Sequence, residues 1–492
     1  MKKKLLFLVA ALALFVPSVM AAEKTAGTEE ELTKALSEAV TGDTIKLTDD
    51  ITFSSDHIRF KGEKELTLDF NNHNLTGNGE TTLIVENGVV TFTGKGTLDV
   101  KDSYVNVWGH EESTSKKKTV LNVDKDVTIL GSTGIAIFYD VKHGAYNTEV
   151  NFAGTIKATE IGITTNGEIL NENGPVVNIK KSATITATGE NGTGIEVRAG
   201  KLNVKGGTIT GTAKKLVSEA NDGGCTTIGA GIAVVQHTTQ LPIEVNITGG
   251  TITGAEALYV NNTQGNPAED WAKVKVVAEG GVFSTDVTKY TADKYVVKKT
   301  TNGYEVVENK ILETKDEKVS FESDKALDSD LKLEVTEKSK EEVTKGNEKV
   351  AEKYKEEKKV KDVKLISLYD INVTDGIQVV PMEDGKFTIA IAIPESDQKY
   401  DNYKVVYFDE EGKLVETLNA KLENGKVVFT TSHLSTYGVV GYNNVTETPT
   451  ETKPEKNPTT SDINLALIIS AIVISTIGVV ITSKKISAKV TR

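Results

Sequence analysis

The stretch LNVKGGTITG at residues 202–211 returns almost unchanged as VNITGGTITG at residues 245–254. Three weaker copies begin at Leu121, Val150 and Val177, so the unit recurs every 25 to 29 residues apart from one step of 43. Apolar and polar residues alternate within it, which in a β-strand places the apolar ones on one face. One such unit cannot bury its apolar face alone, whereas stacked units cover one another. The repeat therefore predicts a mainly β protein built around a parallel β-helix.

A second strand is expected downstream of the first in each unit. The alternative architecture, a sandwich of β-hairpins, would need two-residue turns and does not explain similar units recurring in step. The 43-residue step contains an insertion, residues 213–227, which we expect to leave the coil as a surface loop. The second strands open with Gly134-Ile135, Gly162-Ile163, Gly194-Ile195, Gly231-Ile232 and Ala257-Leu258.

The start of the repeat region carries a helix signal. Thr28 followed by Glu31 is a capping-box pattern, and the apolar residues after it have helical spacing. Such a helix would cover the open apolar end of the solenoid. The apolar positions are Leu32, Ala35, Leu36 and Ala39.

Both ends of the chain have the composition of targeting segments. Three lysines precede an apolar stretch at residues 5–16, which predicts a signal peptide over residues 1–21 with cleavage between Ala21 and Ala22. At the other end, the charge-free run 463–482 has the roughly 20 residues that an α-helix needs to cross a bilayer. We expect a transmembrane helix at 463–483 and a basic cytoplasmic tail at 484–492.

Directly before that run stands Asn457-Pro458-Thr459-Thr460-Ser461. It resembles a sortase sorting signal of Gram-positive bacteria. The resemblance implies that sortase cuts after Thr460 and joins the chain to peptidoglycan. A plain single-span anchor with a chance match is the alternative, because short motifs match easily. Either interpretation places the bulk of the chain outside the cell, anchored to the cell wall or the cell membrane.

The repeat region also resembles a family. The segments GDTIKL at 42–47, LTLDFNNHNLTG at 66–77 and GGVFSTDVTKYTADKY at 280–295 are similar to the pectate-lyase-like right-handed β-helix superfamily, in particular its adhesive branch on bacterial surfaces. The resemblance covers roughly residues 23–309. It implies a right-handed parallel β-helix and specifies architecture better than activity.

We therefore divide the mature chain into a β-helix at 22–309, a second module at 310–442 and a disordered wall linker at 443–462. In the second module the Glu/Lys-rich stretch 341–358 predicts a surface helix. Its ending, HLSTYGVVG from His433, resembles a small β-rich module found near the anchors of Gram-positive surface proteins. Alternating segments predict strands at 363–373, 387–393, 403–408 and 426–430.

The composition of the chain disfavours two classes of partner and excludes an intramolecular disulfide. The chain has 492 residues and a net charge of −13, which disfavours nucleic acid and anionic lipid as partners. Cys225 is its only cysteine, so no intramolecular disulfide can form.

Catalytic residues do not stand out in the sequence. A lyase of the superfamily would need carboxylates that hold calcium and a basic residue that takes a proton. Asp124 and Asp126, expected to share a strand face, are weak calcium candidates, and solvated surface charge is the ordinary alternative. The histidines are scattered without metal-like spacing. We therefore expect no cofactor and assign no catalytic residue.

Candidate ligand-binding residues are Tyr104, Asn106 and Trp108, which alternate onto one face within an excursion, 101–118, that breaks the repeat. An aromatic ring covers the apolar face of a sugar, and amides bond its hydroxyls. The alternative is that these aromatic residues pack the loop onto the coil. Both interpretations, sugar binding and packing, also apply to Trp271.

These observations predict a surface-anchored β-helix adhesin that binds a glycan or a host glycoprotein or matrix polymer through many weak polar contacts. A polysaccharide lyase or glycoside hydrolase is the second hypothesis, so we do not expect an enzyme but keep that alternative. A passive spacer of the cell wall is the third.

Overall fold

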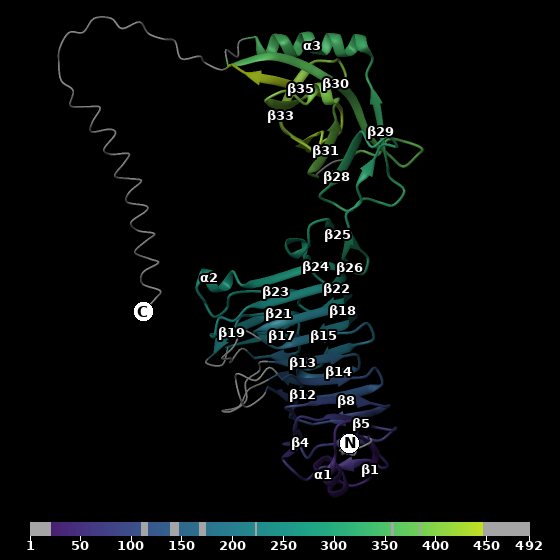
Figure 1. Cartoon of the computed structure of the whole chain (residues 1–492), viewed down its shortest axis with the longest axis vertical. Helices are drawn as coiled ribbons and strands as arrows, with labels where there is room; N and C mark the ends of the chain where they lie inside the picture. The colour runs from purple at the N-terminus through teal and green to yellow at the C-terminus, as the bar shows by residue number, and fades with distance from the viewer. Residues whose placement is uncertain are drawn as a thin grey trace, which may run out of the picture.

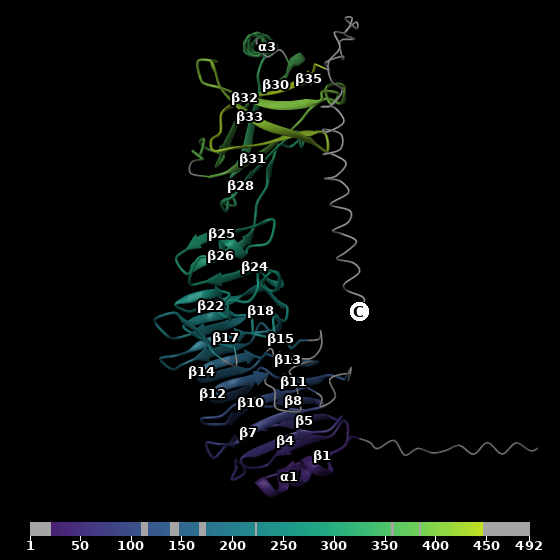
Figure 2. The same ribbon diagram turned by 90° about the vertical axis from the view of Figure 1, so that its left-hand side faces the viewer.

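The computed structural model describes residues 21–109, 117–137, 147–166, 174–221, 224–355, 359–382 and 385–445. Figures 1 and 2 show a solenoid of stacked parallel strands, with a second, antiparallel module beyond its C-terminal end. Among the helices of the described residues, none is long and apolar enough to cross a membrane. The predicted signal peptide up to residue 20, most of the linker, the sorting motif and the membrane helix lie outside the described residues.

The strands of the solenoid form three parallel ladders. The first ladder, here called the open face, contains the start of each repeat. Its register pairs Leu121, Val150, Val177, Leu202 and Val245 in succession, as the repeat predicted. The open face consists of β1 (Glu23–Ala26), β2 (Thr44–Leu47), β5 (Glu65–Asp69), β8 (Val89–Thr93), β11 (Thr119–Val123), β13 (Thr148–Phe152), β15 (Val176–Ile179), β18 (Gly200–Gly211), β22 (Ile243–Thr253) and β24 (Val274–Phe283).

The second ladder follows the first along the chain, and long strands run through both. Ile156 pairs with Ile129 before it and Ile185 after it, so a column of isoleucines fills this side of the core. The ladder is formed by β3 (Ile51–Thr52), β6 (Asn74–Thr76), β9 (Gly96–Asp99), β12 (Val127–Ile137), β14 (Thr155–Thr165), β16 (Thr184–Ala187) and the later parts of β18, β22 and β24.

The third ladder, here called the covered face, contains the predicted second strands. Ile135, Ile163, Ile195, Ile232 and Leu258 are in register, which confirms that prediction. Its strands are β4 (His57–Lys61), β7 (Thr82–Glu86), β10 (Val105–Trp108), the later parts of β12 and β14, β17 (Thr193–Val197), β21 (Ala230–Val234) and β23 (Glu256–Val260).

Glycine recurs before these strands because the backbones of neighbouring rungs approach closely there. A Cβ atom on Gly162 would lie 2.3 Å from Ile185 Cγ2 and 2.4 Å from the Gly194 carbonyl oxygen. Gly194 meets the Gly231 carbonyl in the same way, at 2.4 Å. The glycines of the repeat therefore form a column that any side chain would push apart.

The N-terminal end is closed by helix α1 (Glu29–Glu38), as predicted. Thr28 Oγ1 accepts a hydrogen bond from the Glu31 amide at 3.2 Å, while the Glu31 carboxylate accepts from the amide of Gly27 at 2.8 Å. Leu32 is buried against the first rungs. The first described residues are held as well, since the Ala22 backbone N–H donates to Asp43 Oδ1 at 2.9 Å.

The C-terminal end of the solenoid is closed by the antiparallel hairpin β25 (Tyr295–Thr300) and β26 (Gly303–Glu308). Two short helices precede it, α2 (Ala268–Trp271) and η1 (Thr288–Tyr290). The predicted insertion leaves the coil as the antiparallel hairpin β19 (Val217–Asn221) and β20 (Gly224–Ile228).

The second module is one antiparallel sheet of nine strands with helix α3 (Lys340–Tyr354) packed on β30, close to the surface helix expected at 341–358. One apolar cluster fills the inside of the sheet, and a smaller one lies beneath α3. Turn residues Asn424 and Gly425 both have positive φ, 49° and 79°, which suits a two-residue hairpin. In sheet order the strands are β27 (Leu312–Glu313), β28 (Val319–Ser323), β31 (Phe387–Ala392), β34 (Lys426–Thr431), β33 (Leu414–Glu423), β32 (Asn402–Phe408), β35 (Thr436–Asn444), β30 (Val360–Thr374) and β29 (Lys332–Glu337).

Candidate binding site

Two of the predicted sugar-binding residues, Asn106 and Trp108, lie on the regular strand β10, and Tyr104 directly precedes it. This strand pairs in parallel with β7 before it and β12 after it. Val105 and Val107 point into the core, so Asn106 and Trp108 point outward. Yet Asn106 is only 4 % exposed and Trp108 only 7 %, while Tyr104 is half-buried. The strand register explains the alternation, but it did not predict this burial.

Trp108 supports a charged group instead of offering an open ring. The Arg59 guanidinium lies 5.0 Å from the centre of the Trp108 ring, within cation–π range. Arg59 Nη1 is also 3.4 Å from Glu86 Oε2, and Lys61 Nζ is 3.8 Å from Glu86 Oε1. The Glu86 side chain is 1 % exposed. Two surface cations therefore share one buried carboxylate, and the indole ring orients one of them.

Trp271 belongs to a different part of the covered face. It is half-buried on α2, whose Asp270 carbonyl accepts from Gln236 Nε2 at 3.1 Å. Strands β12, β14, β17 and β21 separate β10 from β23 in this ladder. At about 4.8 Å per strand, Trp108 and Trp271 are roughly 24 Å apart along the axis and do not form one site.

Asp124 and Asp126 were expected on one strand face, but the structure places both in the turn between β11 and β12. Both are exposed, and Asp124 Oδ2 accepts from Thr93 Oγ1 at 2.6 Å. The described residues contain no group of three or more His, Cys, Asp or Glu side chains that could hold a metal ion. A pattern of alternating Asp and Lys favoured a strand, but it is also typical of a solvated turn.

The open face carries a continuous ladder of asparagine side chains, joined by hydrogen bonds from rung to rung. Each Nδ2 group donates to the side-chain oxygen of the rung before it. The first member, Asn122, donates to Thr91 Oγ1 at 3.2 Å. The following bonds are Asn151 to Asn122 at 3.0 Å, Asn178 to Asn151 at 2.9 Å, Asn203 to Asn178 at 2.8 Å and Asn246 to Asn203 at 3.2 Å.

Two carboxylates flank this ladder and are fixed by it. The hydrogen bond from Lys118, together with that from Asn151, holds the pKa of Glu149 below its usual range. Hydrogen bonds from Asn246 and Lys201 lower the pKa of Glu244 in the same way. The open face therefore presents amides and paired charges in fixed positions at neutral pH.

A groove of about 600 Å³ runs along one edge of the open face. Its lining residues come from the beginnings of β11, β13, β15, β18 and β22, which are successive rungs. Lys118, Lys201 and Glu244 supply charge, while Pro175 and Pro242 supply apolar surface. Because the rungs are about 4.8 Å apart, the groove is elongated along the solenoid axis over roughly 19 Å.

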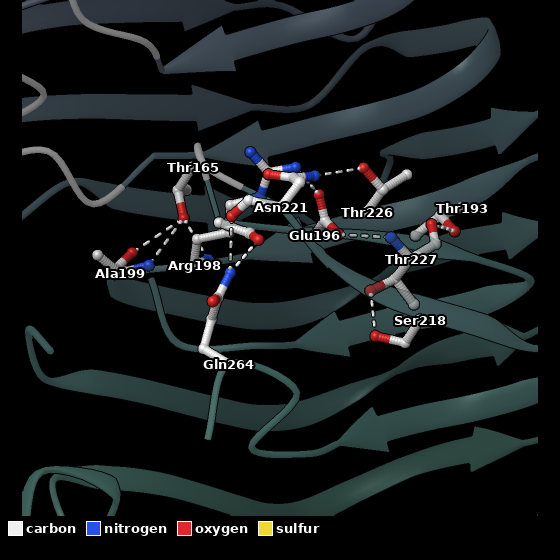
Figure 3. Close-up of polar contacts among 11 residues, drawn as sticks. Thr165, Thr193, Glu196, Arg198, Ala199, Ser218, Asn221, Thr226, Thr227 and Gln264 are labelled. Atoms are coloured by element: carbon white, nitrogen blue, oxygen red, sulfur yellow. Dashed lines mark hydrogen bonds and ion pairs between the residues drawn. The ribbon is translucent and has the colours of Figure 1, made fainter. Parts of the chain in front are cut away.

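The covered face contains a buried ion pair that sequence reasoning missed (Figure 3). Glu196 points outward from β17, yet its side chain is 0 % exposed and accepts from Arg198 Nη2 at 2.7 Å and from the Thr227 amide at 2.9 Å. Burial raises the pKa of Glu196, and the adjacent Arg198 opposes that shift. The signal in the sequence was a charged pair two residues apart, Glu196 and Arg198, within an otherwise apolar second strand.

This pair holds the insertion against the solenoid. Thr227 lies on β20, and its carbonyl accepts a second bond, from Thr193 Oγ1 at 2.5 Å. Figure 3 shows Thr165 from the neighbouring rung close to Arg198, whose backbone amide donates to Thr165 Oγ1 at 3.1 Å. Burial also raises the pKa of the Cys225 thiol on β20. The cluster is thus a structural clamp that leaves its carboxylate inaccessible to a ligand.

Comparisons with protein-family models, with curated proteins and with solved structures found no match for the chain. The parallel β-helix therefore rests on the structure alone, and the resemblance to the pectate-lyase-like superfamily stays a prediction.

Proposed function

We propose that the protein is a cell-surface adhesin whose solenoid binds a glycan or a host surface polymer. The observation that carries this proposal is the open face, where a five-residue asparagine ladder runs beside a groove that crosses five successive rungs. An elongated groove suits an elongated ligand.

The spacing of the rungs supports a multivalent mechanism. Equivalent polar groups recur at intervals of about 4.8 Å along a rigid axis, so a polymer could contact several of them at once. Each contact is weak because it exchanges one hydrogen bond to water for another. Linked contacts gain from effective concentration, and many copies on one cell gain again.

The anchoring part of the proposal rests on the terminal sequence motifs. Export by the predicted signal peptide and attachment to peptidoglycan by sortase would place the second module next to the wall, as a spacer. The N-terminal cap, which lies at the opposite end of the solenoid in Figure 1, would then be farthest from the cell. The resemblance of the repeat region to the pectate-lyase-like superfamily, whose β-helix is right-handed, is consistent with this proposal.

A polysaccharide lyase or hydrolase is the second candidate, because carboxylates and basic residues from different strands do meet. Glu86 on β7 contacts Arg59 and Lys61 on β4. However, the Glu86 and Glu196 carboxylates are both buried, so a polymer at the surface would reach the cations first. This geometry favours binding over proton transfer.

The test is binding of the purified full-length chain to an array of glycans, mucins and matrix proteins, with calcium and with a chelator. We expect saturable binding that leaves the polymer at its original length. Shortened polymer would support the enzyme instead. Absence of binding to every polymer would support a passive spacer. Lys201→Ala, which removes a cation from the groove of the open face, should weaken the binding.

A further inference from the structure

A second polar surface lies at the N-terminal end of the solenoid, between α1 and β4. It is an open pocket of about 500 Å³. The strand β4 reads HIRFK, so its alternate residues His57, Arg59 and Lys61 all point outward, and Lys64 follows in the next loop. Basic groups thus gather on one strand face of a chain with a net charge of −13.

These cations are only partly neutralised. Arg59 and Lys61 share the single buried carboxylate of Glu86. Within the part of the chain that the structure describes, neither His57 nor Lys64 takes part in an ion pair. The site therefore has unpaired positive charge close to an open cavity.

The acidic group of α1 that contacts the lining residue Ser55 is already engaged. Glu29 accepts four hydrogen bonds, from the amides and hydroxyls of Ser54 and Ser55, at 2.5 to 3.1 Å. These bonds lower the pKa of Glu29 to about 2, and the bond from the Ser55 hydroxyl has the largest effect. Its charge is fixed and spread over four donors, so it does not pair with the lysines of the pocket.

The remaining lining fits a sugar ring. Thr33 and Ser37 place hydroxyls on the α1 side, one helical turn apart. Leu36 adds a half-buried apolar side chain to the α1 side, and the core residue Ile58 lies beneath it on β4. A pyranose offers an apolar C–H face, hydroxyls at its rim and, in acidic glycans, a carboxylate or sulfate that a lysine or arginine can bind.

We propose that this pocket binds the anionic substituent, carboxylate or sulfate, of an acidic polysaccharide. This inference rests on the proposed function, because it names the ligand class for one end of the same rod. A site at the end of the rod opposite the second module would contact a host surface before the lateral groove does (Figure 1). Arg59, held between Trp108 and Glu86, is the positioned cation, and Lys61 and Lys64 supply further positive charge beside it.

The experiment uses the full-length chain in detergent and four oligomers of equal length. These are a heparin fragment for sulfate, an oligogalacturonate for carboxylate, a dextran as the neutral control and an oligothymidylate for a phosphate backbone. The variant Lys61→Gln/Lys64→Gln removes two pocket charges and leaves Arg59 with Glu86. Its matched control, Lys289→Gln/Lys294→Gln, removes two exposed lysines at the other end of the solenoid.

We expect one of the two acidic glycans to bind, with Kd rising at least tenfold in the pocket variant and unchanged in the control. The slope of log Kd against log salt should fall by about one to two, because two cations no longer displace counterions. Equal loss in both lysine variants, equal binding of dextran, or tighter binding of the oligothymidylate would each overturn the inference.

The failure of this inference can be told apart from failure of the adhesin proposal. Unchanged affinity of the pocket variant for a polymer that the wild-type chain binds would remove the pocket but leave adhesion by the open face. Absence of binding to every polymer and oligomer by the wild-type chain would remove both. Thermal unfolding of the two lysine variants should match that of the wild type, since all four lysines lie at the surface.

Discussion

The open and covered faces of the solenoid are built from strands of the same rungs, yet their outward side chains have opposite environments. On the open face, the asparagines of the ladder are half-buried and remain at the surface. On the covered face, the outward residues of β10 and β17 are buried, whereas those of β4 at the N-terminal end are exposed. Polar groups on the open face and on β4 can therefore meet a ligand, whereas buried ones on the covered face, such as Glu196, stabilise the fold.

This difference shows that rung register alone does not decide which polar residues are functional. The chemistry available on each face depends on what lies over it, and the hairpin β19–β20 places Thr227 directly on Glu196. We therefore expect substitutions of buried groups on the covered face to change stability, and substitutions on the open face or on exposed residues of β4 to change binding.

The largest effect should come from breaking the buried pair. Arg198→Ala leaves the Glu196 charge buried without its partner, which should reduce the free energy of unfolding by about 3–5 kcal/mol. Replacing both residues, as Glu196→Leu/Arg198→Met, should recover most of that loss because no buried charge remains. Urea unfolding measures both. An Arg198→Ala variant as stable as the wild type would mean that the ion pair does not hold the insertion against the solenoid.

A smaller effect is expected in the middle of the asparagine ladder. Asn178→Ala removes the bond to Asn151 and the bond from Asn203, and should reduce stability by about 1 kcal/mol, since water can reach these half-buried groups. The comparison is Asn246→Ala at the end of the ladder, which removes one ladder bond together with the bond to Glu244. A loss in Asn178→Ala as large as that in Arg198→Ala would erase the proposed distinction between the faces.

Lowering the pH should affect the N-terminal cap and the buried Glu196–Arg198 pair in opposite ways. Backbone N–H groups of Val40 and Ala22 lower the pKa of Asp43, and serine donors lower that of Glu29 to about 2. A carboxylate whose pKa is lowered by folding stabilises the protein above the usual carboxyl range. This stabilisation is lost as the pH falls from about 4.5 towards 2. Glu196 has a raised pKa, so its contribution has the opposite sign and declines as the pH rises.

Asp43→Asn tests this directly. The stability difference between wild type and variant should shrink as the pH falls through that acid range, measured by thermal unfolding at successive pH values. A difference that stays constant down to pH 2 would show that the Asp43 carboxylate does not stabilise the N-terminal cap through its charge.

The smallest effect should come from an exposed pair on the open face. Lys201 and Glu244 lie 3.0 Å apart, but their side chains are 40 % and 47 % exposed. Lys201→Ala should change the free energy of unfolding by less than about 1 kcal/mol, because water and salt screen such pairs. If the groove binds polymer, the same variant should weaken binding. A large stability loss without a binding change would reverse the roles assigned to the two faces.

The sequence predicted the solenoid because its signals are local. Leu202 and Val245 repeat in step, and Gly162-Ile163 and its equivalents mark close backbone approach, so both ladders could be aligned before the structure was known. The register then followed without further information.

The site was harder to predict because burial of an outward side chain depends on distant segments. Trp108 looked like an exposed platform, but it lies against Arg59, which is far away along the chain. Glu196 gave no sign of its bond to Thr227, 31 residues later. Asp124 and Asp126 were assigned to a strand because alternation continues into the turn that follows β11.

The most direct test of the account is hydrogen exchange of the full-length chain with and without a polymer that the array identifies. We predict added protection along the open face, from β11 to β22, and at the pocket beside β4, with no change around Glu196. Protection confined to the second module, or to the hairpin β19–β20, would contradict the assignment of binding to the open face.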